Sequence, residues 1–197
     1  MEKNTEYDIL RIILKQFTRN WTITGLSHEL HLSRVGVWKI LKKMDSRHLI
    51  LLSSLGEGKT NVFHVKLNWE NPIMEKILSL TLTEEAMKHK RWVNNFEDVG
   101  ELTEFTILYG STLISSKEAN DIDLLNIVMS KNKFLKLEKI LRGIEKTQMK
   151  KIHSENLTKS ELSEEIKKLN LAFIDAIKKG VVLFGQEKFI KFIKNLY

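Results

Sequence analysis

Two stretches decide the fold of the C-terminal half of the chain: FTILYGS at residues 105–111 and DIDLLNIVM at residues 121–129. Both contain a short run of apolar, β-prone residues, and a mostly polar segment lies between them. Apolar runs of about four to eight residues bounded by turn residues are typical of buried strands. We therefore predict two buried strands joined by a short polar helix.

The second of these strands opens with two aspartates, Asp121 and Asp123. Because successive side chains of a strand point to opposite faces, both carboxylates project from one face, and Ile122 points into the core. Two such carboxylates can bind Mg²⁺ together with triphosphate oxygens. Gly110 lets the backbone approach phosphate closely, and Ser111 offers a hydroxyl and free N–H groups at the start of a helix.

The Gly-Ser pair, followed after residues 112–120 by Asp-x-Asp, resembles the signature of the DNA polymerase beta-like nucleotidyltransferase superfamily, especially its minimal nucleotidyltransferases. The resemblance covers about residues 100–192, including a closing helix, short strand and glycine. It implies that Asp121 and Asp123 are catalytic and bind the metal, and that Gly110 and Ser111 bind nucleotide. It also implies Mg²⁺ as cofactor and ATP or another NTP as substrate, with an NMP, first of all AMP, passing to a hydroxyl of a protein, an RNA or a small molecule.

Members of this superfamily use a third carboxylate on a neighbouring strand. The predicted strand at 149–157, MKKIHSENL, contains no aspartate. His153 stands where the acid is expected, and Glu155, two residues on, shares its face. Imidazole carries no negative charge and would weaken Mg²⁺ binding, so either Glu155 or His153 has to complete the catalytic set. The alternative is a degenerate domain that keeps a nucleotide or metal pocket without turnover.

The N-terminal part of the chain predicts three helices and a hairpin. Apolar residues recur at helical spacing over 5–18, a second helix begins near Thr24, and Ser33 caps a third whose stripe is Val37, Ile40, Leu41 and Met44. LILLSSL at 49–55 and NVFHVKL at 61–67 are β-prone, and the glycines between them suit a hairpin turn. This order is similar to a winged helix-turn-helix over about residues 5–68.

In winged helices the third helix enters the major groove and the wing contacts the DNA backbone. The resemblance therefore implies that DNA is contacted by Ser33, Arg34, Lys39, Lys42, Lys43 and Lys59. A net charge of +7 favours such a polyanionic partner. The same basic face can be merely solvated, and winged helices also mediate protein association, a homodimer being the default expectation on two-fold DNA sites. Trp38 can pack on DNA sugar, on a dimer partner or against the first helix, and packing within the protein is the default expectation.

Composition excludes several classes of protein. The chain has no cysteine, which removes disulfides, thiol nucleophiles and thiolate metal sites. No apolar run approaches the roughly 18 residues that cross a bilayer, and the first residues are too polar for a signal peptide, so we expect a cytoplasmic chain with no membrane partner. His28 and His31, at i and i+3, would bind a metal only if further ligands converged.

The remaining patterns complete a mixed α+β chain. A long helical stretch is predicted from Asn71-Pro72 to about residue 100, followed in the α/β part by helices at 131–146, 159–179 and 186–196 and a VVLF strand. We therefore expect a winged helix-turn-helix at 1–70, a helical connector at 71–100, and a nucleotidyltransferase-like α/β domain with a small mixed sheet at 101–197. The predicted function is an Mg²⁺-dependent nucleotidyltransferase with a nucleic-acid-binding winged helix. The alternative is a DNA-binding transcriptional regulator whose degenerate transferase-like domain senses nucleotide or mediates association.

Overall fold

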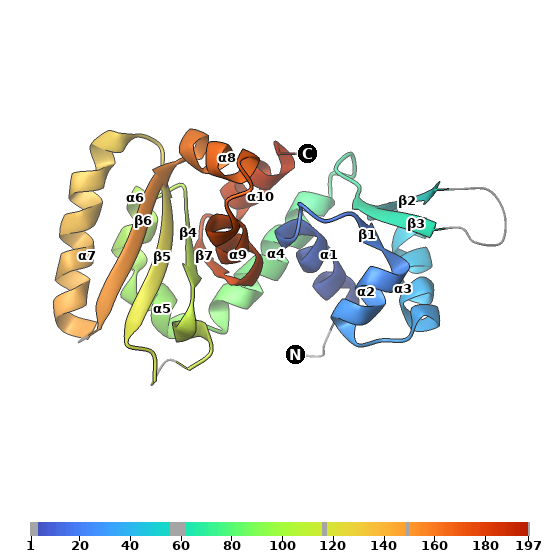
Figure 1. Cartoon of the computed structure of the whole chain (residues 1–197), viewed down its shortest axis with the longest axis horizontal. Coiled ribbons are helices and arrows are strands. Elements are labelled where there is room, and N and C mark those ends of the chain that lie inside the picture. The colour runs from blue at the N-terminus through green and yellow to red at the C-terminus, as the bar shows by residue number, and fades with distance from the viewer. Residues whose placement is uncertain (1–3, 56–61, 116–117, 149, 197) are drawn as a thin grey trace. The chain divides into compact units, whose positions relative to one another are not determined.

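The computed structural model describes residues 4–55, 62–115, 118–148 and 150–196 (Figure 1). The chain divides into two compact units, Met1–Leu78 and Ser79–Tyr197. The division falls inside residues 71–100, the stretch predicted as a connector. Each unit contains one small sheet, so the fold class is mixed α+β, as the sequence predicts. Among the helices of the described residues, none is both long enough and apolar enough to cross a membrane.

Three helices followed by a hairpin make up most of the first unit: α1 (Thr5–Lys15), α2 (Ile23–Leu30), α3 (Arg34–Ser46), β2 (Ile50–Leu55) and β3 (Val62–Leu67). β2 and β3 pair antiparallel, which confirms the predicted hairpin. The hairpin turn itself, at residues 56–61, lies outside the described residues. A two-residue strand that the sequence analysis missed, β1 (Trp21–Thr22), adds to the other side of β3.

The third helix begins as its sequence predicts. The Ser33 hydroxyl accepts the Gly36 N–H at 3.0 Å, the bond that defines an N-cap and satisfies one of the unpaired N–H groups of the first turn. Val37, Leu41 and Met44 of the predicted apolar stripe are fully buried, and Ile40 at the edge of the stripe is half-buried.

The second unit begins with the C-terminal part of α4 (Met74–Met87), which runs across the division, and continues over the described residues with further helices and strands in chain order. These are α5 (Lys90–Asn95), α6 (Glu97–Leu102), β4 (Phe105–Tyr109), β5 (Asp121–Val128), α7 (Phe134–Gln148), β6 (Lys151–Thr158), α8 (Lys159–Lys167), α9 (Leu171–Lys179), β7 (Val181–Phe184) and α10 (Gln186–Lys194), with short 3-10 turns η1 (Ser111–Leu113) and η2 (Lys131–Lys133). The strand order is β6-β5-β4-β7. β5 and β6 are parallel and β4 is antiparallel to both its neighbours, so the sheet is small and mixed, as predicted.

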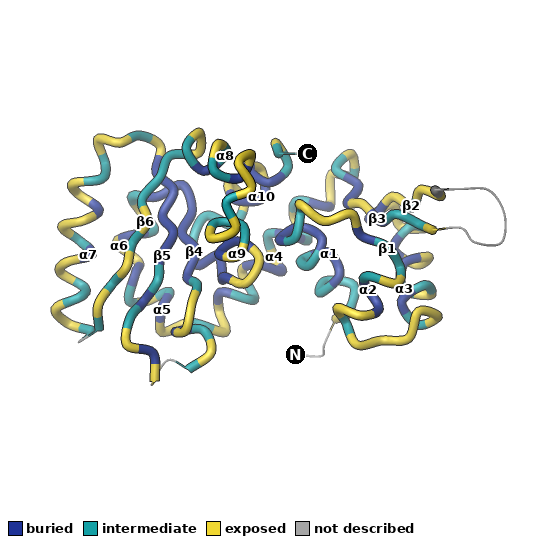
Figure 2. The backbone as a smooth tube through the Cα atoms, viewed as in Figure 1, coloured by how far each residue is buried: buried dark blue, intermediate teal, exposed yellow. Residues whose placement is uncertain are grey.

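Helices cover both faces of this sheet (Figure 1). On one face, Ile122 and Leu124 of β5 are buried with residues of α5, α6 and α7, among them Trp92 and Leu137. On the other face, Phe105 of β4 packs edge-on against Phe189 of α10, with ring centres 5.5 Å apart. The strands at the centre of the sheet are therefore buried along most of their length, as Figure 2 shows for β4 and β5.

Two predicted helices are broken in the structure. The stretch predicted as one helix from residue 71 forms three, and Trp92 of α5, Val99 of α6 and Phe96 between these two helices belong to the core of the second unit. The helix predicted over 159–179 is two helices, because Leu169 adopts a left-handed conformation with φ 57° and Asn170 then caps α9. The short polar helix after β4 is present, but as one turn of 3-10 helix.

Candidate functional site

Asp121 and Asp123 lie at the open end of β5. Their side chains are 35% and 22% exposed, whereas Ile122 between them is fully buried. Along β5 the exposure falls from this end to the buried Leu124–Val128 (Figure 2). The strand therefore presents both carboxylates on one face while its alternate residues anchor it in the core, which is the arrangement that the sequence predicts.

His153 is brought to the same place by the parallel pairing of β5 with β6. The register sets His153 beside Asp123, on the same face of the sheet. Its Nδ1 lies 3.4 Å from Oδ2 of Asp121 and 3.5 Å from Oδ1 of Asp123. Among the residues that the structure describes, these three form the one group whose potential metal-ligand atoms all converge, within 4.8 Å of one another.

Gly110 has a structural role that the sequence does not predict. Its backbone adopts φ 80° and ψ −161°, a region that side chains with a Cβ rarely occupy. A Cβ added there would overlap Oδ2 of Asp123 and would lie 3.0 Å from its Cγ. Glycine is therefore needed at this position to leave room for the Asp123 carboxylate.

Ser111 follows Gly110 at the same edge of the sheet and begins η1. The Ser111 residue is exposed, and its neighbour Thr112 is buried. The Thr112 hydroxyl donates a hydrogen bond of 2.6 Å to the carbonyl oxygen of Asp121. This bond ties η1 to the start of β5, so Gly110, Ser111 and the two aspartates are held together. Thr112 was not predicted as a site residue, because nothing in its immediate sequence indicates its partner.

The electrostatic environment of the site is acidic. Burial raises the pKa of the Asp123 carboxyl above its ordinary value, and the Asp121 charge raises it further, while His153 opposes the rise. Burial also raises the pKa of the Tyr109 hydroxyl, and the charges of Asp123 and Glu155 add to this effect. Two neighbouring carboxylates, one of them partly buried, are a condition that a bound cation would relieve.

Tyr109 is a site residue that sequence reasoning missed. It is the last residue of β4 and pairs directly with Asp123 across the sheet. Because paired residues of neighbouring strands project to the same face, its ring flanks the carboxylate on the side opposite His153. Two features of the sequence could have indicated it. Tyr109 stands immediately before the Gly-Ser pair, and strand alternation places it on the same face as Phe105 and Ile107.

Glu155, the other residue considered for the third acid, lies apart from the two aspartates. In the register of β5 and β6 it pairs with Leu125, two residues further along the strand, and it is exposed. It does not belong to the converging group formed by Asp121, Asp123 and His153. Of the two alternatives left open by the sequence, the structure brings the imidazole to the aspartates and leaves the carboxylate beyond them.

The basic residues predicted on the third helix are all exposed, but their environments differ. Lys43 forms an ion pair of 2.8 Å with Glu6 of α1. Lys42 lies over the ring of Trp38, 5.1 Å from its centre. Arg34 and Lys39 have no ion pair among the described residues. These last two cations are therefore available to an external anion without first breaking an internal contact.

Ser33 and Lys59 are the other two residues predicted to contact DNA. The Ser33 hydroxyl is already used as the N-cap of α3, and Lys59 lies outside the described residues. Trp38 packs against Phe63 of β3, with ring centres 5.0 Å apart, which joins the third helix to the hairpin. Trp38 is therefore packed within its own unit, as the default expectation has it, and its ring partner is on the hairpin, a placement that the sequence did not predict.

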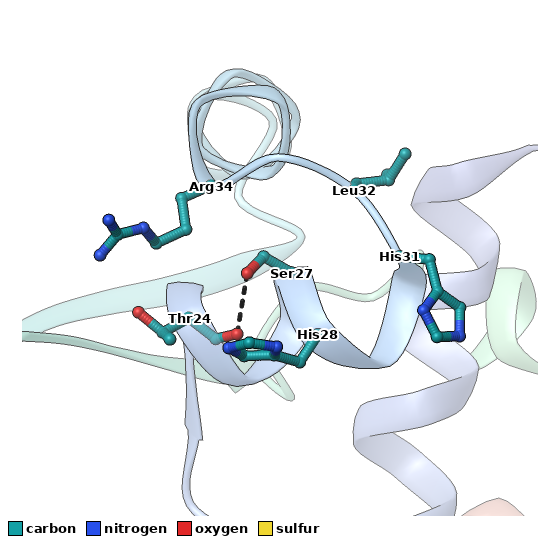
Figure 3. A pocket seen from close by; sticks show the side chains of 6 residues that line it. All are labelled: Thr24, Ser27, His28, His31, Leu32 and Arg34. Atoms are coloured by element: carbon teal, nitrogen blue, oxygen red, sulfur yellow. Dashed lines mark hydrogen bonds between the residues drawn. The ribbon is translucent and has the colours of Figure 1, made fainter.

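A hollow of about 520 Å³ lies where α2 turns into α3, at the N-terminal end of the third helix. It is lined by Thr24, Ser27, His28, His31, Leu32 and Arg34 (Figure 3). The Ser27 hydroxyl donates to the Thr24 carbonyl oxygen at 2.9 Å. Both histidines belong to the C-terminal end of α2, His28 in its last turn and His31 as its C-cap, and their rings lie apart (Figure 3). His28 and His31 do not belong to any converging ligand group among the described residues.

The resemblance to nucleotidyltransferases is carried by a small number of residues, namely the Gly-Ser pair and the Asp-x-Asp pair. The structure brings these two motifs together at the end of one sheet. The family assignment itself remains a prediction from those motifs. In comparisons with known proteins, no family model, no curated protein and no solved structure matched the chain.

Proposed function

We propose that the second unit is a divalent-metal-dependent nucleotidyltransferase that moves an NMP, in the first instance AMP from ATP, to a hydroxyl acceptor. One observation carries the proposal: Gly110 leaves room for Asp123 at the point where the two aspartates share an exposed strand end. A glycine whose conformation and close approach both serve one carboxylate has no evident purpose in a merely solvated turn.

The residues of the site supply binding and orientation. Asp121 and Asp123 would hold one divalent cation, for which Mg²⁺ is the ion that the resemblance implies. Such a cation would neutralise triphosphate charge and polarise the phosphate that is attacked. The backbone at Gly110 and the hydroxyl of Ser111 would contact phosphate oxygens, while the buried Thr112 keeps this turn against β5.

The described residues do not fit a second Mg²⁺. A pair of magnesium ions needs a further carboxylate beside the first two, and Glu155 lies two residues along β6 from that position. His153 stands there instead, and its imidazole offers nitrogen to an ion that prefers oxygen. The chemistry that we assign to this chain therefore uses one cation.

The proposal is tested by incubating the full chain with α-labelled NTPs and cell extract, with and without Mg²⁺. We expect metal-dependent label on an acceptor, lost in Asp121→Asn/Asp123→Asn, which keeps the size of both side chains and removes their charge. Asp175→Asn is the matched control, because Asp175 is an exposed residue of α9 that pairs with Lys179. Label that persists in the double variant would refute the assignment.

For the first unit we infer a winged helix-turn-helix that binds DNA. The inference is supported by three helices followed by a hairpin, and by two exposed cations on α3, Arg34 and Lys39, without internal ion pairs among the described residues. Phosphate contacts release counterions, so binding weakens as salt rises. Duplex binding by the full chain is measured over a salt series, and no binding at low salt would favour a protein-interaction role.

A second function is favoured by the position of Glu155. Without a third carboxylate beside the aspartates, the unit would bind nucleotide without turnover, and the chain would act as a DNA-binding regulator that senses nucleotide. The two functions differ in one measurement, DNA affinity with and without ATP and a divalent cation. A nucleotide-dependent change in affinity in the absence of any labelled acceptor supports the regulator; labelled acceptor at unchanged DNA affinity supports the transferase.

A further inference from the structure

We propose that Asp121, Asp123 and His153 bind one divalent transition-metal ion, of the kind represented by Zn²⁺, and that His153 sets the preference of the site for such ions over Mg²⁺. This assignment identifies the cation of the proposed function, and the role of the bound ion in nucleotidyl transfer rests on that proposal. The binding itself is independent of turnover, because it follows from three side chains that already converge.

The distances from the His153 nitrogen to the two aspartates suit tetrahedral coordination. Two ligands placed about 2.1 Å from an ion lie about 3.4 Å apart when the angle between them is tetrahedral, and about 3.0 Å apart when it is octahedral. The Nδ1 of His153 lies 3.4 Å and 3.5 Å from the nearest oxygens of the two aspartates. These separations match the tetrahedral value, which Zn²⁺ favours, more closely than the octahedral value that Mg²⁺ requires.

The donor set leads to the same ion. Mg²⁺ takes oxygen ligands and gives up its waters reluctantly, whereas imidazole nitrogen is a good ligand for Zn²⁺ and its neighbours in the first transition row. The two carboxylates balance the charge of the divalent ion, and a neutral imidazole completes a set of three protein ligands. Zinc sites that act on substrates keep three protein ligands and one open position.

The exposure of the site provides that open position. His153 is 59% exposed and Asp121 is 35% exposed, so one side of the group faces solvent. Gly110, whose backbone lies against Asp123, borders the group without a side chain of its own. A water or a phosphate oxygen can therefore reach an ion held by the three side chains without displacing any of them.

The experiment is direct metal binding by the full chain, without nucleotide. Zn²⁺ and Mg²⁺ are titrated by calorimetry into wild type, His153→Asp and His153→Asn. Nearly any carboxylate site holds Zn²⁺ more tightly than Mg²⁺, so the decisive quantity is the change in the ratio of the two affinities. His28→Asn is the matched control, because His28 is an exposed histidine of the other unit, outside the converging group.

We expect one Zn²⁺ per chain at this site, and a selectivity ratio that falls by about tenfold or more in His153→Asp because a carboxylate replaces imidazole. His153→Asn is expected to lose Zn²⁺ affinity without gaining Mg²⁺ affinity, and His28→Asn is expected to behave as wild type. A Zn²⁺ affinity unaffected by both changes at His153 would overturn the proposal, and so would wild type that binds no Zn²⁺.

A spectroscopic measurement covers the case in which a His153 variant does not fold. Co²⁺ absorbs visible light strongly in tetrahedral sites and weakly in octahedral ones, so wild type loaded with Co²⁺ is expected to show the strong band, displaced by Zn²⁺ and not by equal Mg²⁺. A weak octahedral spectrum would contradict the proposed coordination. Zn²⁺ binding of this kind without nucleotidyl transfer would refute the proposed function alone, and transfer with Mg²⁺ by a chain that ignores Zn²⁺ would refute the metal assignment alone.

Discussion

Replacing Gly110 by alanine provides the sharpest test of the site. The backbone at this position has φ 80° and ψ −161°, and holding a residue with a Cβ there costs about 1–3 kcal/mol. The added Cβ would also overlap Oδ2 of Asp123. The main chain of Asp123 is fixed by pairing with Tyr109 on one side and His153 on the other, so the carboxylate itself has to rotate away.

Two losses are therefore expected in Gly110→Ala. The free energy of unfolding falls by about 1–3 kcal/mol, measured by urea unfolding of the full chain followed by circular dichroism. Divalent-cation affinity, measured by calorimetry, falls by about tenfold or more, because a rotated Asp123 no longer faces Asp121 and His153. Both effects come from one atom, which is why the variant distinguishes a built site from an ordinary turn.

Gly143 offers a matched control. It lies within α7, and a Cβ added there would meet nothing within 4 Å. Because glycine weakens a helix relative to alanine, Gly143→Ala is expected to raise the free energy of unfolding by about 0.5–1 kcal/mol and to leave cation binding unchanged. If Gly110→Ala unfolds at the urea concentration of wild type and binds the cation equally well, the reasoning about Gly110 is wrong. A loss of stability with unchanged cation binding would show that glycine at position 110 only avoids backbone strain and does not hold the Asp123 carboxylate in place.

Three further predictions concern residues outside the metal-binding group. Asn126→Ala removes the centre of a buried hydrogen-bonded row, with bonds of 2.9 Å from Thr106 and 2.9 Å to Ser154, and is expected to cost about 1–3 kcal/mol in urea unfolding; a loss below about 0.5 kcal/mol would contradict this. The pKa of the Glu104 carboxyl is lowered below its ordinary 4.5, chiefly by the hydrogen bond from Lys159. The ionised Glu104 therefore stabilises the fold above pH 4.5, and this stabilisation is lost as pH falls through the lowered pKa. Glu104→Gln should therefore flatten the acid side of the stability profile, and an unchanged profile would be inconsistent with the ion pair. Lys39→Ala should reduce the slope of log affinity for DNA against log salt by about 0.9, and Lys43→Ala, whose cation is engaged by Glu6, should reduce it less; equal slopes would argue against groove binding by this face.

Much of the fold could be predicted because local sequence and tertiary packing agree. The cap at Ser33 and the strands that begin at Phe105 and Asp121 are encoded within a few residues of where they form. The short strand β1 could not be predicted, because two residues carry no periodicity and pair only once β3 is in place. The break at Leu169 was also missed, since a left-handed leucine has no signature in a helical pattern.

The candidate site likewise has a part that the sequence predicts and a part that depends on the folded chain. Asp121 and Asp123 share a face because side chains alternate along every strand, so their common orientation follows directly from their spacing in the sequence. The contact of Thr112 with the Asp121 carbonyl and the pairing of Tyr109 with Asp123 depend on three-dimensional folding of the turn and the sheet. The sequence predicts Gly110 as a phosphate-binding residue, but the overlap with Asp123 that makes glycine necessary there depends on how the end of β4 packs beside β5.

The choice between His153 and Glu155 depends on the register of β5 against β6, and the buried polar row fixes that register. Asn126 lies opposite Asn156 and donates to both Ser154 and Asn156. A slip of two residues would set Glu155 beside Asp123, but it would also move Asn156 from Asn126 to the fully buried Leu124. An amide buried against leucine without a partner costs about 1–3 kcal/mol, and the bonds of Asn126 would be lost as well. The imidazole therefore stands beside the aspartates because of residues on the opposite face of the sheet, and a change at Asn126 is a change to the site.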